Sequence, residues 1–343
     1  MTGEKRTGRP HALALFSGGL DSTLAILLIQ RQNINVTAVG FKTQFWGRYV
    51  DDPSSTLPQH PTAQKFGFAL KRVHLDKKFI DIVLNPKFGY GKNMNPCVDC
   101  KILMLREAKA LSEEIGADFI ITGEVLGQRP FSQLRDKIHL IEREAGLKGK
   151  LLRPLSAKLL PPTEAEVKGL VDREQLENIS GRSRKRQMEL ACEFGLEDYP
   201  SPAGGCLLTD KSYANRLRDL IKHTGSLTPD DPDLIRFGRH IRLDDRTKII
   251  VGKNEQDNDH LETLKREHHY VIEAKDIGSP LTLLIGEPSE ENLRKAAMIT
   301  ARYSATKHQP EVCVTVERMS DGTIQEFTVA PTSPADLGAI LLR

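Results

Sequence analysis

Short apolar runs alternate with segments of helical periodicity through the first half of the chain. The length of these runs and their β-branched content predict buried strands of a parallel sheet. Because strands and helices alternate, we expect right-handed crossovers and a doubly wound α/β domain. The expected strands cover residues 12–16, 34–41, 69–75, 117–123 and 150–155, and a helix covers 101–115.

A different pattern follows. Residues 163–195 have helical periodicity, and the proline- and aspartate-rich stretch before residue 232 indicates a linker. Short strands at 240–243, 248–251, 270–273, 281–285 and 312–318, with helices at 258–267 and 290–304, then predict a smaller α+β domain. The expected organisation is a basic N-terminal tail (1–10), an α/β domain (11–210), a linker (211–230) and an α+β domain (231–343).

Composition agrees with two packed domains. The chain has 343 residues, of which 39% are hydrophobic and 28% charged. Its net charge is only +3, so any basic surface for nucleic acid must be local. No apolar run approaches the roughly 20 residues that span a bilayer, and the basic N-terminus has no apolar signal segment. We therefore expect a cytoplasmic protein without a membrane partner.

The strongest motif lies between the first strand and the first helix, where the chain reads SGGLDST from Ser17. Glycines let the backbone approach an anion, and the helix N-terminus that follows favours a phosphate. The motif is not a Walker loop, which ends in Gly-Lys-Ser/Thr. It resembles the SGGxDS signature of the PP-loop ATP pyrophosphatases, whereas the alternative is an ordinary strand-to-helix turn. The expected nucleotide-binding residues here are Phe16, Ser17, Gly18, Gly19, Asp21, Ser22 and Thr23.

Further residues are expected at the same edge of the sheet. In doubly wound sheets, ligands bind beyond the carboxyl ends of the strands. Phe41 ends the second expected strand, and Thr122 and Gly123 end the fourth. We therefore expect them to line the same site as the SGGLDST loop.

Three of the five cysteines are candidates for chemistry. Cys97 and Cys100 form a CxxC on a loop that enters a helix, where both sulfurs can reach one metal or cluster. A redox pair or half of a zinc site are the alternatives, although no second CxxC follows. Cys206 lies in a loop rich in proline and glycine. Cys192 and Cys313 lie in helical and strand patterns, so we interpret them as core residues.

A basic cluster lies within the segment 163–195. Several arginines in a row suit RNA phosphates, whereas a solvated helix face is the alternative. Its candidate RNA-binding residues are Arg182, Arg184, Lys185 and Arg186.

Together, SGGLDST, the TGExLGQ stretch at 122–128 and the PCxxC…GGC cysteines resemble the tRNA thiolation enzymes. These are the 4-thiouridine synthase (ThiI) and 2-thiouridylase (MnmA) branches of the PP-loop superfamily, whose fold is HUP-like. The resemblance covers about residues 10–210, adds Gln128 to the ATP site, and is closer to the 4-thiouridine branch. Residues 250–258 and 296–303 are similar to the NFACT-R type of RNA-binding domain, which implies RNA contacts by Lys253 and Asn254.

The resemblance implies ATP-dependent thiolation of a tRNA uridine. ATP and Mg²⁺ would adenylate the uridine carbonyl at a site that contains Asp21, releasing pyrophosphate and later AMP. Sulfur would come from hydrosulfide or from a cysteine desulfurase. The resemblance implies a 4Fe–4S cluster on Cys97, Cys100 and Cys206. The alternative is a persulfide on Cys206 that Cys100 resolves.

Other functions remain open from the sequence. They are 2-thiolation of the anticodon wobble uridine, formation of an amide by a PP-loop ligase, and non-catalytic binding of RNA or ribosomes. The sequence leaves the modified uridine, the sulfur donor and the oligomeric state undetermined.

Overall fold

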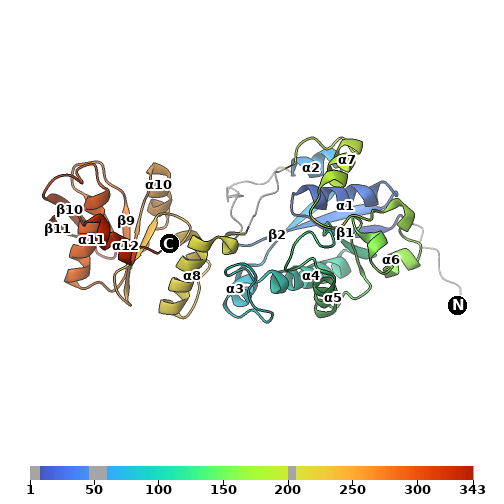
Figure 1. The fold of residues 1–343 in the computed structure, drawn as a ribbon, viewed down its shortest axis with the longest axis horizontal. Coiled ribbons are helices and arrows are strands. Elements are labelled where there is room, and N and C mark those ends of the chain that lie inside the picture. The colour runs from blue at the N-terminus through green and yellow to red at the C-terminus, as the bar shows by residue number, and fades with distance from the viewer. Residues whose placement is uncertain (1–7, 46–59, 200–205, 343) are drawn as a thin grey trace. The chain divides into compact units, whose positions relative to one another are not determined.

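The chain folds into two compact units, Met1–Cys206 and Leu207–Arg343. The computed structural model describes residues 8–45, 60–199 and 206–342 (Figure 1). Cys206 therefore stands at the end of the first unit, directly after a segment outside the described residues. Among the described residues, no helix has the length and apolar character needed to cross a membrane.

The first unit is built on five parallel strands in the order β3-β2-β1-β4-β5. This confirms the expected α/β fold. Strand order reverses beside β1, which pairs with β2 on one side and β4 on the other, and such a switch point is where these sheets bind ligands. The strands are β1 (His11–Leu15), β2 (Asn35–Lys42), β3 (Ala69–His74), β4 (Phe119–Thr122) and β5 (Leu151–Leu152).

Helices cover both faces of this sheet (Figure 1). On one face, α1 buries Ile26 and Ile29 against Ala12 and Ala14 of β1. On the other, α4 packs beside α3 and α5. The helices are α1 (Leu20–Gln30), α2 (Pro61–Phe66), α3 (Asp76–Leu84), α4 (Cys97–Glu114) and α5 (Arg135–Glu144).

The segment 163–195 is not the continuous helix that we predicted. It forms α6 (Glu164–Val167), a 3-10 turn (Arg173–Gln175) and α7 (Lys185–Glu193). Gly169 and Gly181 adopt φ values of +68° and +78°, which stop a right-handed helix. The prediction for Cys192 is also wrong, because this cysteine on α7 is exposed.

The second unit contains a six-stranded antiparallel sheet in the order β11-β10-β8-β9-β7-β6. This confirms an α+β domain, to which β11 and α12 are additions that the sequence did not predict. Cys313 is half-buried in β10. The strands are β6 (Arg239–Arg242), β7 (Thr247–Val251), β8 (Tyr270–Ala274), β9 (Thr282–Gly286), β10 (Val312–Arg318) and β11 (Thr323–Val329). The helices are α8 (Lys211–Thr224), α9 (Asp231–Leu234), α10 (Glu255–Thr263), α11 (Glu290–Tyr303) and α12 (Pro334–Ile340).

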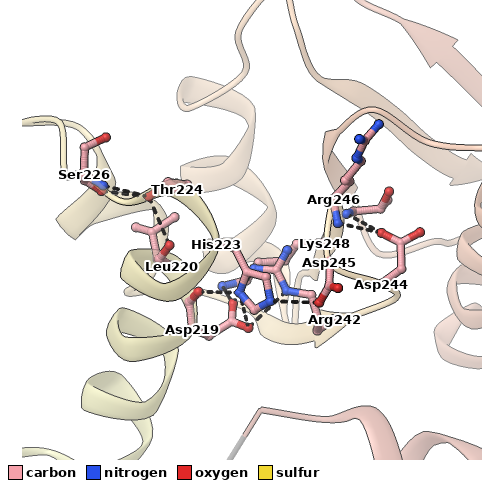
Figure 2. Close-up of polar contacts among 11 residues, drawn as sticks. Asp219, Leu220, His223, Thr224, Ser226, Arg242, Asp244, Asp245, Arg246 and Lys248 are labelled. Atoms are coloured by element: carbon pink, nitrogen blue, oxygen red, sulfur yellow. Dashed lines mark hydrogen bonds and ion pairs between the residues drawn. The ribbon is translucent and has the colours of Figure 1, made fainter.

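Much of the expected linker is helix α8. Asp210 caps its N-terminus, and Gly225 ends it with φ +69°. Asp219 on α8 accepts hydrogen bonds from Arg242 at 2.6 and 3.0 Å and from Lys248 at 3.0 Å (Figure 2). Burial opposes ionisation of Asp219, but these cations outweigh it and lower its pKa. The ion pairs therefore fasten α8 to the sheet of the second unit.

Candidate phosphate loop and cysteine cluster

The SGGLDST loop folds as a strand-to-helix turn stabilised by its own hydroxyl groups. Ser22 Oγ donates to the carbonyl of Gly19 at 2.9 Å and lies 3.2 Å from Ser17 Oγ. Thr23 Oγ1 donates to the same carbonyl at 3.1 Å. Gly18 has φ +74°, a conformation that a side chain disfavours. The first N–H groups of α1 lack intrahelical acceptors, so the turn leaves them available to an anion.

The end of β4 touches this loop. A Cβ on Gly123 would lie 2.5 Å from the backbone N and Cα of Ser22, so only glycine fits. Five residues later, Gln128 donates from Nε2 to Asp21 Oδ2 at 2.9 Å. The SGGLDST and TGExLGQ motifs, distant in sequence, therefore form one structure.

Asp21 retains an oxygen for a cation. Its Oδ1 is buried and has no hydrogen-bond partner. A carboxylate oxygen is the ligand that Mg²⁺ prefers, so Asp21 fits the expected metal. The other expected residues are supports: Phe16, Phe41 and Thr122 are buried at the ends of their strands.

His60 is a residue of this site that sequence analysis missed. Its ring meets Phe16 edge-on, with centroids 5.1 Å apart, and its Nε2 would lie 3.2 Å from a Cβ on Gly18. The Nδ1 atom accepts a hydrogen bond from Thr62 N at 3.3 Å, so the neutral ring carries its proton on Nε2. Burial and the charge of Arg72 lower the pKa of His60. A neutral N–H donor therefore stands beside the phosphate loop.

Two cations lie on the neighbouring strands β2 and β3, where Lys42 ends β2 and Arg72 lies within β3. Burial and the charge of Arg72 also lower the pKa of Lys42, so Arg72 lies near both Lys42 and His60. The Nη1 atom of Arg72 is buried and has no hydrogen-bond partner. These cations make the side of the loop that faces β3 favourable for an anion.

The cysteine pair occupies the first turn of α4. Burial raises the pKa of Cys97, against the opposing influence of Lys101, Arg129 and a hydrogen bond with Asn95. Burial raises the pKa of Cys100 further, and the charges of Cys206 and Cys97 add to this effect. The three expected cysteines are therefore close enough to interact electrostatically.

The described residues include no group of three His, Cys, Asp or Glu side chains arranged to hold a metal. The cysteine set nevertheless fits a soft metal or cluster in donor chemistry, because thiolates are its preferred ligands and metal binding displaces thiol protons.

A buried ionic chain connects the cysteines to β4. Lys101, next to Cys100, donates to Glu124 at the end of β4, and Arg153 donates to the same carboxylate at 2.9 Å. Burial opposes ionisation, yet these two cations lower the pKa of Glu124 to about 2. Arg153 also pairs with Glu142. Sequence analysis missed Lys101 and Arg153, because only the fold brings them to Glu124.

The basic cluster near α7 is not uniformly available to RNA. Arg186 is bound to Glu177 at 2.9 and 3.1 Å and to Glu193 at 2.8 Å, and the bonds to Glu177 contribute most to its raised pKa. Arg182 and Lys185 are exposed, whereas Arg184 buries its Nε. This arrangement leaves Arg182 and Lys185 as the better RNA candidates.

The candidates in the second unit also differ. Asn254 caps α10 by accepting from Asp257 N at 2.8 Å, so its side chain has a structural role. Lys253 is exposed, and partial burial and the charge of Arg216 lower its pKa.

Comparison with protein families finds one matching family model in each unit. Residues 8–158 match the family model "Thiamine biosynthesis protein (ThiI)", and residues 238–339 match "NFACT protein RNA binding domain". Residues 8–158 are thus similar to the ThiI family, and residues 238–339 are similar to the NFACT RNA-binding domain. The ThiI-family match contains both motifs of the phosphate loop and the cysteine pair.

Curated relatives have related names. The chain is 28% identical over 152 residues to "Probable tRNA sulfurtransferase" of Thermococcus kodakarensis, covering 42% of this chain and 36% of the relative. It is 30% identical over 206 residues to "tRNA-specific 2-thiouridylase MnmA" of Chlorobium chlorochromatii, covering 55% of each. A further MnmA, of Clostridioides difficile, is 24% identical over 356 residues and covers 90% of this chain and 88% of the relative. The chain thus spans about a third to a half of the first two relatives.

Proposed function

We propose that this protein is an ATP-dependent enzyme that thiolates a uridine of tRNA. The relatives named tRNA sulfurtransferase and 2-thiouridylase support the reaction class. The observation that carries the proposal is the junction of Asp21 with Gln128 and of Gly123 with Ser22, which joins the phosphate loop to the TGExLGQ motif. Lys101 and Glu124 connect the same edge to the cysteines.

The first step is adenylation of the uridine. The carbonyl oxygen attacks the α-phosphorus of ATP, and pyrophosphate leaves, which converts a poor leaving group into AMP. The N-terminus of α1 and Ser17 bind the departing phosphates. Asp21 would hold Mg²⁺, which when bound would supply positive charge against the charge that develops on these phosphates. His60 donates from Nε2 to a phosphate oxygen. Sulfur then attacks the activated carbon and displaces AMP.

The three cysteines would deliver the sulfur in the second step. Cys97, Cys100 and Cys206 would hold a 4Fe–4S cluster, which when bound supplies an iron to carry hydrosulfide. Lys101 and Arg129 stabilise thiolates at this position, because both charges favour the ionised form of Cys97. The alternative is a persulfide on Cys206, with Cys100 as the resolving thiol.

We further propose that the product is 4-thiouridine, because the TGExLGQ stretch resembles the 4-thiouridine branch. The alternative is 2-thiolation of the wobble uridine. The sulfur donor is hydrosulfide or sulfur from a cysteine desulfurase. The NFACT-R-type domain would bind the tRNA, a role that its family description supports.

The proposal is tested by separating the two steps. The purified protein is incubated with a tRNA transcript, ATP, Mg²⁺ and sulfide without oxygen, and both pyrophosphate and thiolated nucleosides are measured. Cys206→Ser should abolish sulfur insertion and retain ATP binding, whereas Asp21→Ala should abolish pyrophosphate release. The exposed Cys192→Ser serves as the matched control and should be fully active.

Different results separate the alternatives. Full sulfur insertion by Cys97→Ser, with a cysteine desulfurase and cysteine in place of sulfide, would remove the cluster and leave the two-cysteine route. Pyrophosphate release that requires an amine instead of tRNA would favour an amide-forming ligase. RNA binding with neither activity in the wild type would favour a non-catalytic protein.

A further inference from the structure

Two exposed aromatic side chains lie near the cysteine pair, at the loop of residues 86–96 that leads to α4. Tyr90 is 42% exposed and Phe131 is 50% exposed. They flank Gly91, where a Cβ would lie only 3.3 Å from Cγ of Phe131. The ring of Phe131 therefore rests against the backbone next to Tyr90. We call Tyr90 and Phe131 the aromatic patch.

Hydrogen bonds hold the two loops that carry this patch. The Tyr90 hydroxyl donates to the carbonyl of Val83 at 2.6 Å, and Gly91 N donates to the carbonyl of Asn95 at 2.8 Å. In the other loop, Gln133 N donates to the carbonyl of Arg129 at 3.1 Å. The rings are thus presented to solvent by fixed backbone, although their apolar surface would be more stable when buried.

The patch borders the sulfur site. Asn95, which accepts from Gly91, also hydrogen-bonds the thiol of Cys97. Contacts therefore run without a break from Phe131 through Gly91 and Asn95 to Cys97. A molecule that covers the rings would lie beside the reacting sulfur.

The charge of the side chains in the two loops is positive, and the one carboxylate bonded to their backbone among the described residues, Asp99 of α4, is buried. Residues 86–96 and 125–134, which form the two loops, contain Lys87, Lys92 and Arg129 and no aspartate or glutamate. Lys87 is paired with Glu144 at 2.7 Å. Lys92 and Arg129 are exposed, and neither has a carboxylate partner within the described part of the chain. Arg129 also lies near enough to Cys97 to influence its pKa.

We propose that the aromatic patch is a stacking platform for unpaired RNA bases next to the target uridine, with Lys92 and Arg129 contacting the adjoining phosphates. This inference rests on the proposed thiolation function. A uridine can reach the cysteines only after it leaves its stack, which unstacks its neighbours. Exposed aromatic rings bind such bases, and the exposed cations Lys92 and Arg129 are complementary to their phosphates.

The test measures RNA binding by fluorescence anisotropy, using the full chain and a labelled tRNA transcript. We expect Phe131→Ala and Tyr90→Ala each to weaken binding about tenfold, because one stacked base is lost. Phe131→Trp should restore wild-type affinity. Arg129→Ala should lower the slope of log Kd against log salt concentration by about one, because one phosphate contact is lost. Phe131→Ala should leave this slope unchanged. Val167→Ala, at another exposed apolar residue, is the control.

ATP binding by each variant reports folding and separates this inference from the proposed function. If the wild type binds ATP and tRNA and both alanine variants retain its affinity, the platform is overturned and the proposed function stands. If the wild type binds no tRNA, both are overturned. Unchanged RNA affinity combined with loss of sulfur transfer from a protein donor would also overturn the platform and make the patch a protein-docking surface.

Discussion

Gln128 donates a 2.9 Å hydrogen bond to Asp21 across 107 residues of sequence. This bond leaves Asp21 Oδ1 buried and without a partner at the N-terminus of α1. The amide therefore orients the carboxylate and leaves one oxygen for a cation. The phosphate loop thus depends on the segment after β4 for its geometry.

Replacing Gln128 by alanine should weaken nucleotide binding. The Oδ2 atom of Asp21 would lose its hydrogen bond, worth about 1 kcal/mol, so we expect the Kd for Mg-ATP to rise about fivefold. Isothermal titration with Mg-ATP and with metal-free ATP checks this. An equal effect on both forms would contradict a role of Asp21 in holding the metal.

Gly123→Ala should have a larger effect. Its methyl group would lie 2.5 Å from backbone atoms of Ser22, so β4 and α1 must separate. We expect a loss of about 1–3 kcal/mol in stability, as in other overpacked sites, together with loss of ATP binding. Thermal unfolding and ATP titration measure both. Gly8→Ala, which places its methyl group in open space, is the control, and equal behaviour of the two variants would contradict the close contact.

His60→Ala should weaken pyrophosphate binding and leave AMP binding unchanged. The Nε2 proton faces the Gly18 turn, where the departing phosphates are expected. One hydrogen bond to a charged group contributes about 1.5–3 kcal/mol, so affinity should fall at least tenfold. Because the pKa of His60 is lowered below 6.5, the ring is neutral above pH 7.5, and this difference should stay constant from pH 7.5 to 8.5. Equal losses of affinity for AMP and pyrophosphate would contradict a contact between His60 and the departing phosphates.

The second unit should lose stability in mild acid through His269. This ring is buried and accepts from Arg266 N at 3.2 Å, and burial lowers its pKa from 6.5 to about 4. Between pH 6.5 and 4, His269 is protonated in the unfolded chain and neutral in the folded state. The free energy of unfolding should therefore fall, by up to about 3 kcal/mol, as the pH decreases from 6.5 to 4.

Hydrogen exchange of peptides from β8 and β9, measured in the full chain, checks this pH dependence. His269→Asn should reduce the slope of the profile, and the exposed His308→Asn should not. A part of the slope should remain, because burial also lowers the pKa of His240 in β6. An unchanged profile in His269→Asn would assign the acid sensitivity to other groups.

The elements that the sequence predicted are those with local signals. The apolar runs of β1, β2 and β4 are short and bounded by polar turns, and the SGGLDST loop contains its own stabilising hydroxyls. The continuous helix over 163–195 failed because two positive-φ glycines override its periodicity. Helix α8 was missed because the prolines after it suggested a linker.

Residues with tertiary roles were beyond sequence reasoning. His60 becomes informative only beside Gly18, and Lys101 only when the fold brings Glu124 to it. Arg186 fitted a basic cluster, but its partners Glu177 and Glu193 come into reach only in the folded chain. No periodicity contains such information.

The most direct test of the account is nucleoside mass spectrometry of an unmodified tRNA transcript after incubation with the purified protein, ATP, Mg²⁺ and isotopically labelled sulfide. We predict labelled 4-thiouridine that requires ATP and is absent with Asp21→Ala and Cys206→Ser. Labelled 2-thiouridine would retain thiolation and change the position. No thiolated nucleoside with sulfide, nor with a cysteine desulfurase and labelled cysteine, from a protein that binds both ATP and tRNA, would contradict the account.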